Sequence, residues 1–282
     1  MSQLIGVLGA GQMGNGIAHV FAQHEYAVLL YDISEAQIEK ALKTIAQNLE
    51  RQAKKDIIAA DQIPAILARI RVVKTIEDFA GCDVVVEAAS ENEALKFDLF
   101  RRLDAAAKAE AILASNTSSI SITRLGAATK RPDRVIGMHF MNPVPVMQLV
   151  EVIRGLATSD ATFQTVAGLV EALGKTMAVA QDYPGFIVNR ILMPMINEAI
   201  FALYEGVASA EDIDKGMKLG TNHPMGPLAL ADLIGLDTTL AILTVLYEGF
   251  KDPKFRPCPL LVKMVDAGYL GKKSGRGFYT YA

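Results

Sequence analysis

Short apolar runs of strand length alternate with helical patterns through the first two thirds of the chain. After most of these runs, apolar residues recur at helical spacing. This alternation predicts βαβ units and a mostly parallel sheet flanked by helices. The predicted strands are residues 4–8, 26–31, 71–76, 83–89, 111–114, 135–138, 149–153 and 176–182.

The pattern changes at the turn formed by residues 182–185, Asp-Tyr-Pro-Gly. Beyond this turn the periodicity is helical only, which predicts two domains, residues 1–183 and 184–282. The long apolar helix expected over 186–203 is too hydrophobic to stand alone. We therefore expect it to pack at the domain junction or at a dimer interface. The other helices expected in this domain are residues 210–219, 229–233, 237–250 and 260–267.

A glycine-rich turn joins the first predicted strand to the first helix. Gly9, Gly11 and Gly14 form a GxGxxG pattern, whose small residues let backbone N–H groups approach a pyrophosphate at the helix N-terminus. Asp32 ends the second strand, where a carboxylate can accept hydrogen bonds from the adenosine ribose hydroxyls and repel a 2′-phosphate. The pattern predicts a Rossmann-type doubly wound sheet that binds NAD rather than NADP. A simple tight turn with a cap at Asp32 is the structural alternative.

The crossover after the second strand is longer than a minimal one and predicts an inserted helical hairpin. Arg51, Lys54 and Lys55 lie at i, i+3 and i+4, so one face of this hairpin is basic. The residues themselves leave two interpretations open, a solvated surface or a clamp for an anionic, phosphate-bearing substrate tail. The predicted fold class is α/β, a Rossmann-type mostly parallel sheet with this hairpin, followed by a smaller all-α domain.

Composition narrows the classes of function. The net charge of −3 gives no electrostatic case for binding nucleic acid or an anionic membrane surface. No apolar run approaches membrane-spanning length, and the N-terminus lacks the pattern of a signal peptide. Cys82 and Cys258 form neither a disulfide framework nor a metal cluster. We expect a cytoplasmic protein with no metal, no nucleic-acid partner and no membrane.

The stretch from Arg134 to Ile153 carries the candidate acid–base pair. His139 follows one apolar run, and Glu151 interrupts the next. Carboxylates are seldom buried without a partner, so we expect Glu151 to hold His139. A histidine satisfied within the core is the structural alternative.

Other polar residues follow predicted strands on the side where doubly wound sheets bind ligands. Glu91 and Lys96 are candidates near the cofactor, although Glu91 could equally cap a helix. Residues 115–119, Ser-Asn-Thr-Ser-Ser, can supply donors to a substrate oxygen or serve only as turn chemistry. Asn189, near the start of the long helix, either faces a cleft or forms an interhelical hydrogen bond.

A dinucleotide fold with a His/Glu couple and no metal cluster points to hydride transfer assisted by a general base. Oxidation of a secondary alcohol needs the hydroxyl proton removed while hydride leaves the carbon. Histidine suits this role because its ordinary pKa of about 6.5 lies near working pH. A carboxylate on the other ring nitrogen fixes the tautomer and stabilises the imidazolium.

Five longer motifs are distributed along the chain. They are SNTSS at 115–119, HFMNPVPVM at 139–147, LVEV at 149–152, PGFIVNR at 184–190 and GKKSGRGFY at 271–279. Together they resemble the L-3-hydroxyacyl-CoA dehydrogenase family, and most closely its bacterial 3-hydroxybutyryl-CoA members. The resemblance extends from the first strand to the last ten residues, and Met141 replaces a phenylalanine usual in the family.

The resemblance implies NAD-dependent interconversion of (S)-3-hydroxyacyl-CoA and 3-oxoacyl-CoA, with 3-hydroxybutyryl-CoA and acetoacetyl-CoA as the expected pair. It implies that His139 is the general acid/base, that Glu151 orients it, and that Ser118 and Asn189 bind the reacting oxygen. It also favours Arg51 and Lys55 as contacts to the CoA nucleotide, and a homodimer formed by the helical domain. The expected NAD (NADH) site comprises Gly9, Gly11, Gln12, Met13, Gly14, Asp32, Glu91, Lys96, Asn116, Ser118 and Asn142.

Two other functions remain as hypotheses. A β-hydroxyacid dehydrogenase acting on a free acid would use the same cofactor fold, but such enzymes typically rely on a lysine. A non-catalytic NAD-binding relative would need no complete set of Ser118, His139, Glu151 and Asn189, so the presence of all four argues against it.

Overall fold

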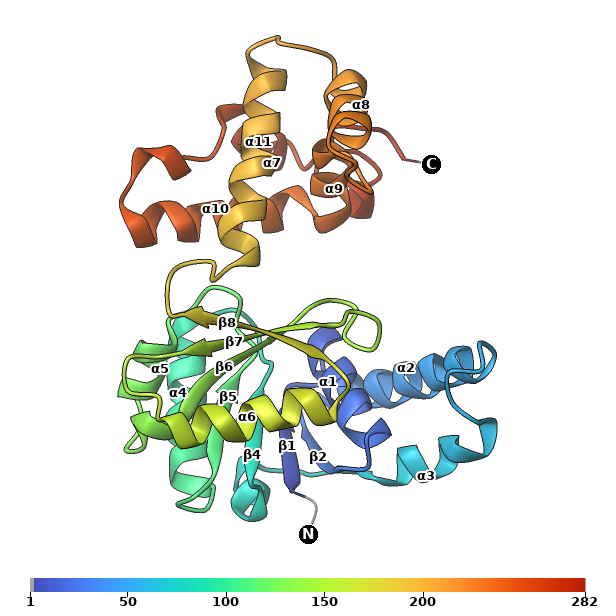
Figure 1. Ribbon diagram of the computed structural model, residues 1–282, viewed down its shortest axis with the longest axis vertical. Helices are drawn as coiled ribbons and strands as arrows, with labels where there is room; N and C mark the ends of the chain where they lie inside the picture. Colours follow the sequence, from blue (N-terminus) through green and yellow to red (C-terminus); the bar gives the residue numbers. More distant parts are fainter. Residues whose placement is uncertain (1–2, 282) are drawn as a thin grey trace. The chain divides into compact units, whose positions relative to one another are not determined.

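The computed structural model describes residues 3–281. The chain divides into two compact units, Met1–Tyr183 and Pro184–Ala282. Figure 1 shows the first unit as a sheet flanked by helices and the second as helices alone.

An eight-stranded sheet forms the centre of the first unit, with strand order β3-β2-β1-β4-β5-β6-β7-β8. Strands β1 to β6 run parallel, whereas β7 runs antiparallel to β6, and β8 pairs parallel with β7. The predicted α/β fold with a mostly parallel sheet is confirmed. The strands are β1 Leu4–Leu8, β2 Ala27–Tyr31, β3 Ile70–Val72, β4 Val84–Glu87, β5 Ile112–Ser115, β6 Val135–Phe140, β7 Leu149–Arg154 and β8 Thr176–Gln181.

Helices cover both faces of the sheet, because successive strand residues point to opposite faces and the side chains on both faces are apolar. Val84 and Val86 pack into a core that also receives side chains from α1, α2, α3 and α6. Val85 lies between them and faces the side that carries η2 Ile76–Gly81. The helices are α1 Gln12–Gln23, α2 Glu35–Ala53, η1 Ala60–Gln62, α3 Ile63–Ala68, α4 Glu93–Ala106, α5 Ile122–Ala127, η3 Pro132–Arg134 and α6 Asp160–Ala172.

The predicted strand 71–76 was wrong over most of its length. Strand β3 ends at Val72, and the 3-10 helix η2 begins at Ile76. The carboxylate of Asp78 accepts the backbone N–H groups of Lys74 and Thr75, each at 3.0 Å. This local hydrogen bonding competes with strand pairing and ends the strand early.

Helix α5 was missed by the sequence analysis. Its N-cap is Ser121, whose hydroxyl accepts the Arg124 N–H. Asp182, at the far end of the unit's sequence, accepts the N–H groups of Ile122 and Thr123 at 2.9 and 2.7 Å. A six-residue helix held by so distant a carboxylate has little periodicity of its own to detect.

The second unit packs its helices around one apolar core. Helix α7 buries Met193, Ile196 and Ile200 in that core, and its Ile191 is exposed. No single described helix has the length and hydrophobicity needed to span a membrane, and α9 and α10 reach that threshold only as a pair bent by 99°. The helices are α7 Val188–Tyr204, α8 Ala210–Gly220, α9 Pro227–Ile234, α10 Leu236–Phe250, η4 Pro253–Phe255, α11 Pro259–Asp266 and η5 Lys272–Ser274.

One buried imidazole links α1 to α2. His19 is fully buried, and its Nε2 lies 3.3 Å from Oε1 of Gln52. Its Nδ1 has no hydrogen-bond partner among residues 3–281. Burial lowers the pKa of His19 below its ordinary value, against the smaller opposing effect of the Gln52 hydrogen bond.

This burial predicts a pH-dependent stability. Below the ordinary pKa of about 6.5 the unfolded chain protonates His19 while the folded chain keeps it neutral, so stability is complete above that pH and falls as the pH drops. The unfolding temperature of His19→Gln should therefore fall less than that of the wild type when the pH is lowered from 7.5 to 5.5. Calorimetric scans of both proteins, with His223→Gln as control, test this. Parallel wild-type and His19→Gln profiles would contradict it.

Candidate active site

A histidine and a glutamate face each other across the one antiparallel strand pair of the described sheet. His139 of β6 and Glu151 of β7 are direct register partners. Nδ1 of His139 lies 2.7 Å from Oε2 of Glu151. Glu151 is fully buried and His139 is 9% exposed, so the pair is shielded from solvent. The expected contact is present, and its geometry suits a carboxylate that fixes the imidazole tautomer.

Asn116 holds the end of the strand that carries His139. Its side-chain oxygen accepts the N–H of Phe140 at 2.9 Å. The backbone N–H of Asn116 donates to the main-chain oxygen of Glu87 at 2.8 Å. Asn116 was predicted to bind cofactor, and its side-chain oxygen here ties the ends of β5 and β6 together.

The loop between β6 and β7 is held by a lysine that the sequence analysis did not single out. Nζ of Lys175 donates to the main-chain oxygens of Val144 and Met147, at 2.7 and 2.8 Å. Partial burial lowers the pKa of Lys175. Across the loop, Nε2 of Gln12 donates to Oδ1 of Asn142 at 3.2 Å. The loop that follows His139 is therefore attached to the glycine-rich turn.

The glycine-rich turn has the shape that a dinucleotide requires. Gly9 has a φ of +104°, and a Cβ there would overlap the main chain at Ala88. A Cβ on Gly14 would overlap the Gly9 carbonyl oxygen. Nothing lies within 4 Å of a Cβ placed on Gly11, so that side of the turn is open to a ligand. With no acidic residue in its first turn, α1 presents N–H groups suited to a pyrophosphate.

Asp32 is fixed by the backbone on both sides. Its Oδ2 accepts the Ala10 N–H at 2.7 Å, and its Oδ1 accepts the Ser34 N–H at 2.9 Å. The Ser34 hydroxyl accepts the Gln37 N–H, and the Ser34 N–H donates to Asp32. Each carboxylate oxygen keeps acceptor capacity for a ribose hydroxyl.

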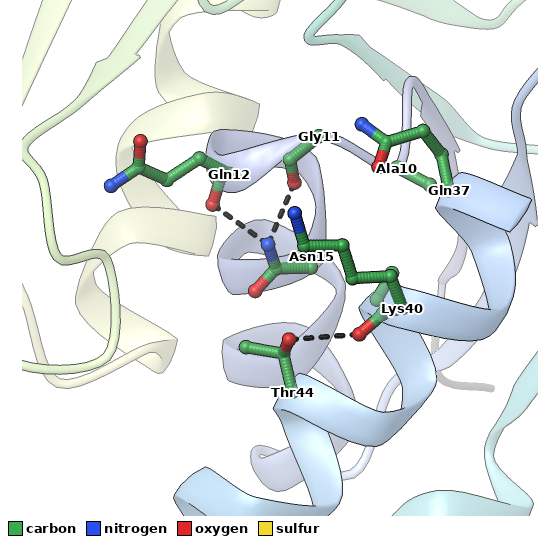
Figure 2. A pocket seen from close by; sticks show the side chains of 8 residues that line it. Ala10, Gly11, Gln12, Asn15, Gln37, Lys40 and Thr44 are labelled. Carbon is green, nitrogen blue, oxygen red and sulfur yellow. Dashed lines mark hydrogen bonds between the residues drawn. The ribbon is translucent and has the colours of Figure 1, made fainter.

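A hollow of about 260 Å³ adjoins the glycine-rich turn. Figure 2 shows Asn15 donating to the carbonyl oxygens of Gly11 and Gln12, and Lys40 reaching from α2 toward Asn15. Polar and cationic groups beside open backbone can hold the phosphates and ribose of a nucleotide. The lining residues are Ala10, Gly11, Gln12, Asn15, Gln37, Lys40, Ala41 and Thr44.

A second polar cluster lies where β4 and β5 end. Glu91 does not cap a helix, because the N-cap of α4 is Asn92. Glu91 instead binds the 115–119 turn, since its Oε1 accepts the Thr117 hydroxyl, the Ser118 N–H and the Ser119 hydroxyl. Burial alone would raise the pKa of Glu91, but the Lys96 ammonium and these donors together hold that pKa below its usual value.

Lys96 lies beneath this turn, nearly fully buried. Its Nζ donates to Oε1 of Glu87 at 2.6 Å and lies 3.3 Å from Oε2 of Glu91. Glu87 is fully buried and was missed by the sequence analysis. The available signal was an acidic residue closing the otherwise apolar strand Val84–Glu87.

The remaining predicted residues lie elsewhere in the two units. Arg51 and Lys55 are exposed on the last turn of α2 and just beyond it. Asn189 is buried in the first turn of α7, in the second unit. Among the described residues, no group of three or more His, Cys, Asp or Glu side chains could hold a metal ion.

The doubly wound sheet, the glycine-rich turn with Asp32 and the buried His–Glu pair define an NAD-binding dehydrogenase. Family models agree, because the 3-hydroxyacyl-CoA dehydrogenase NAD binding domain matches residues 4–183 and the C-terminal domain of the same family matches residues 185–281. The chain therefore belongs to the 3-hydroxyacyl-CoA dehydrogenase family.

Individual relatives cover nearly the whole chain. The 3-hydroxybutyryl-CoA dehydrogenase of Bradyrhizobium diazoefficiens is 58% identical over 277 residues, which are 98% of this chain and 94% of that protein. A probable 3-hydroxybutyryl-CoA dehydrogenase of Bacillus subtilis is 55% identical over 98% of this chain and 96% of its own length. The crystal structure of (S)-3-hydroxybutyryl-CoA dehydrogenase from Ralstonia eutropha superposes with a TM-score of 0.97, at 53% identity and full coverage of both chains.

The position of Asp32 predicts cofactor selectivity. In Asp32→Ala, loss of the Ala10 hydrogen bond loosens the turn for both cofactors, whereas loss of the charge relieves repulsion of a 2′-phosphate only. The ratio of the NADPH Kd to the NADH Kd should thus fall by about tenfold or more, equivalent to about 1.4 kcal/mol. Fluorescence titrations of wild type, Asp32→Ala and the exposed control Asp61→Ala measure it. An unchanged ratio would disprove the role of Asp32.

Proposed function

We propose that this protein is an NAD-dependent (S)-3-hydroxyacyl-CoA dehydrogenase that interconverts 3-hydroxybutyryl-CoA and acetoacetyl-CoA. The observation that carries the proposal is the buried 2.7 Å contact between His139 and Glu151, in a chain whose family is established. The names of the relatives from Bradyrhizobium diazoefficiens and Ralstonia eutropha support the four-carbon substrate pair.

His139 would move the proton of the reacting hydroxyl. When bound, NAD supplies the chemistry of hydride exchange with the substrate carbon. With Nδ1 donating to Glu151, the acceptor atom of the neutral ring is Nε2, and this atom takes the proton during oxidation and returns it during reduction. The carboxylate of Glu151 stabilises the imidazolium that forms. Its full burial strengthens that interaction, because little water is present to screen it.

Ser118 is proposed to bind the reacting oxygen from the side of the β5 exit. Its backbone N–H is held by Glu91, and its hydroxyl has no hydrogen-bond partner among residues 3–281. A donor of this kind can stabilise negative charge that develops on the oxygen during hydride transfer. Asn189, buried in the first turn of α7, is proposed as a further substrate-binding residue.

Removing the imidazole tests the mechanism. His139→Ala should lower kcat for acetoacetyl-CoA reduction by roughly 10²- to 10⁴-fold, the usual contribution of general acid–base catalysis. The NADH Kd should change less than about threefold, because the predicted cofactor contacts lie on other residues. Stopped-flow turnover and NADH titration measure the two quantities, with His223→Ala as control.

The same assay separates the competing functions. Wild-type protein that binds NADH but reduces no acetoacetyl-CoA would be a non-catalytic relative. Equal turnover of free acetoacetate would favour a free-acid dehydrogenase. A series of 3-oxoacyl-CoA substrates of increasing length then shows whether the four-carbon substrate is preferred.

The basic end of α2 is proposed to contact the CoA nucleotide. Arg51 and Lys55 are exposed there and available to phosphate groups. Lys55→Ala should raise KM for acetoacetyl-CoA by about tenfold but leave KM for acetoacetyl-pantetheine, which lacks the nucleotide, unchanged. Lys43→Ala, at an exposed position within α2, is the matched control. An equal effect on both thioesters would place the CoA nucleotide elsewhere.

The second unit is proposed to form a homodimer. It exposes several large apolar side chains, including Ile191, Val207 and Leu219, at 67%, 72% and 80% exposure. Sedimentation equilibrium should give twice the chain mass of 30.4 kDa, and a monomer at micromolar concentration would contradict the proposal.

A cytoplasmic location is also proposed. It is supported by two buried free cysteines, Cys82 and Cys258, and burial raises the pKa of Cys82 to about 12.

A further inference from the structure

We propose that Glu87 is a positioning residue that sets the placement of Ser118 through Ser115 and Lys96. The inference rests on the proposed function, because it assigns Glu87 a role in presenting the substrate-binding hydroxyl. Glu87 lies at the last position of β4, is fully buried, and acts only through its neighbours.

The two carboxylate oxygens of Glu87 have different partners. Oε1 accepts Nζ of Lys96 at 2.6 Å and the Ala89 N–H at 2.7 Å. Oε2 accepts the hydroxyl of Ser115 at 2.7 Å. A fully buried carboxylate is costly unless every such contact is made. The surrounding donors therefore hold Glu87 in one orientation.

Ser115 connects Glu87 to the next residues of the turn by hydrogen bonds. Its hydroxyl donates to Glu87, so its oxygen is aimed to accept the N–H of Thr117, at 3.1 Å. The Thr117 hydroxyl oxygen in turn accepts the N–H groups of Ser119 and Ile120, at 3.2 and 2.9 Å. This chain of hydrogen bonds runs from Glu87 to both sides of Ser118.

Lys96 supplies the second route to Ser118. Its buried ammonium lies between Glu87 at 2.6 Å and Glu91 at 3.3 Å, and it also donates to the Ala89 oxygen. Glu91 accepts the Ser118 N–H. If Glu87 lost its charge, the ammonium would be drawn toward Glu91, and Glu91 would bind the turn less well.

The start of the same turn is also joined to the strand that carries His139. Asn116 follows Ser115 and accepts the N–H of Phe140, the residue next to His139. The turn is thus fixed to β6 by Asn116 and to β4 by Glu87. The separation of the Ser118 hydroxyl from His139 depends on both attachments, and a displacement of about 1 Å can cost about 10² in rate.

Kinetics with acetoacetyl-CoA and NADH test the proposal. Glu87→Gln, nearly isosteric but uncharged, should lower kcat by about 10- to 100-fold. In a Ser118→Ala background the same substitution should lower kcat less than about threefold, because the hydroxyl that it displaces is already gone. Glu77→Gln, on an exposed glutamate of the same unit, is the control and should leave kcat unchanged. Ser115→Ala leaves the ion pair intact and carries the same test if Glu87→Gln does not fold.

Amide hydrogen exchange over residues 115–121 gives a readout that needs no turnover. Glu87→Gln should speed exchange at the Thr117 and Ser118 amides by about tenfold, and Glu77→Gln should not. If the wild-type protein does not reduce acetoacetyl-CoA, the proposed function is wrong, and amide exchange alone then tests the role of Glu87. An unchanged kcat, an equal loss in both backgrounds, or unchanged exchange at these amides would each overturn the positioning role.

Discussion

The antiparallel pairing of β6 with β7 is the constraint on which the rest of the site depends. It places His139 directly opposite Glu151, so both side chains project from the same face of the sheet. A shift of one residue in register would turn Glu151 to the opposite face. Lys175, which holds the connecting loop by two main-chain oxygens, and Asn116, which holds the end of β6, keep that register in place.

A buried ionic cluster fixes the turn at the ends of the neighbouring strands β4 and β5. Lys96 lies between two carboxylates, Glu87 and Glu91, and each of them binds part of the 115–119 turn. Such a cluster adds little net stability, because desolvation opposes the Coulomb attraction. Its value is geometric, since each member has one satisfactory position. Charged groups buried at strand ends are therefore a reason to look for a precisely placed loop.

Local chemistry predicted much of this architecture. The glycine spacing, Asp32 at the end of β2 and the strand and helix periodicities identified an NAD-binding α/β fold, and the family motifs identified the catalytic candidates. Prediction failed where side-chain carboxylates bind backbone N–H groups and so decide local structure. The expected strand 71–76 ends at Val72 because Asp78 caps a 3-10 helix, and α5 depends on Asp182, about sixty residues away in sequence.

The sequence by itself determined the fold class, the cofactor and the candidate acid–base pair, because spacing and residue type are local properties. It left Glu87 as an unremarked acidic residue in an apolar strand, and it left Glu91 open between a helix cap and a ligand-side role. Only the tertiary structure showed that Glu87 meets Lys96 and Ser115, and that Glu91 binds the turn while Asn92 caps the helix. The physical reason is that these contacts join separate strands and loops, and their energies depend on burial that only packing creates.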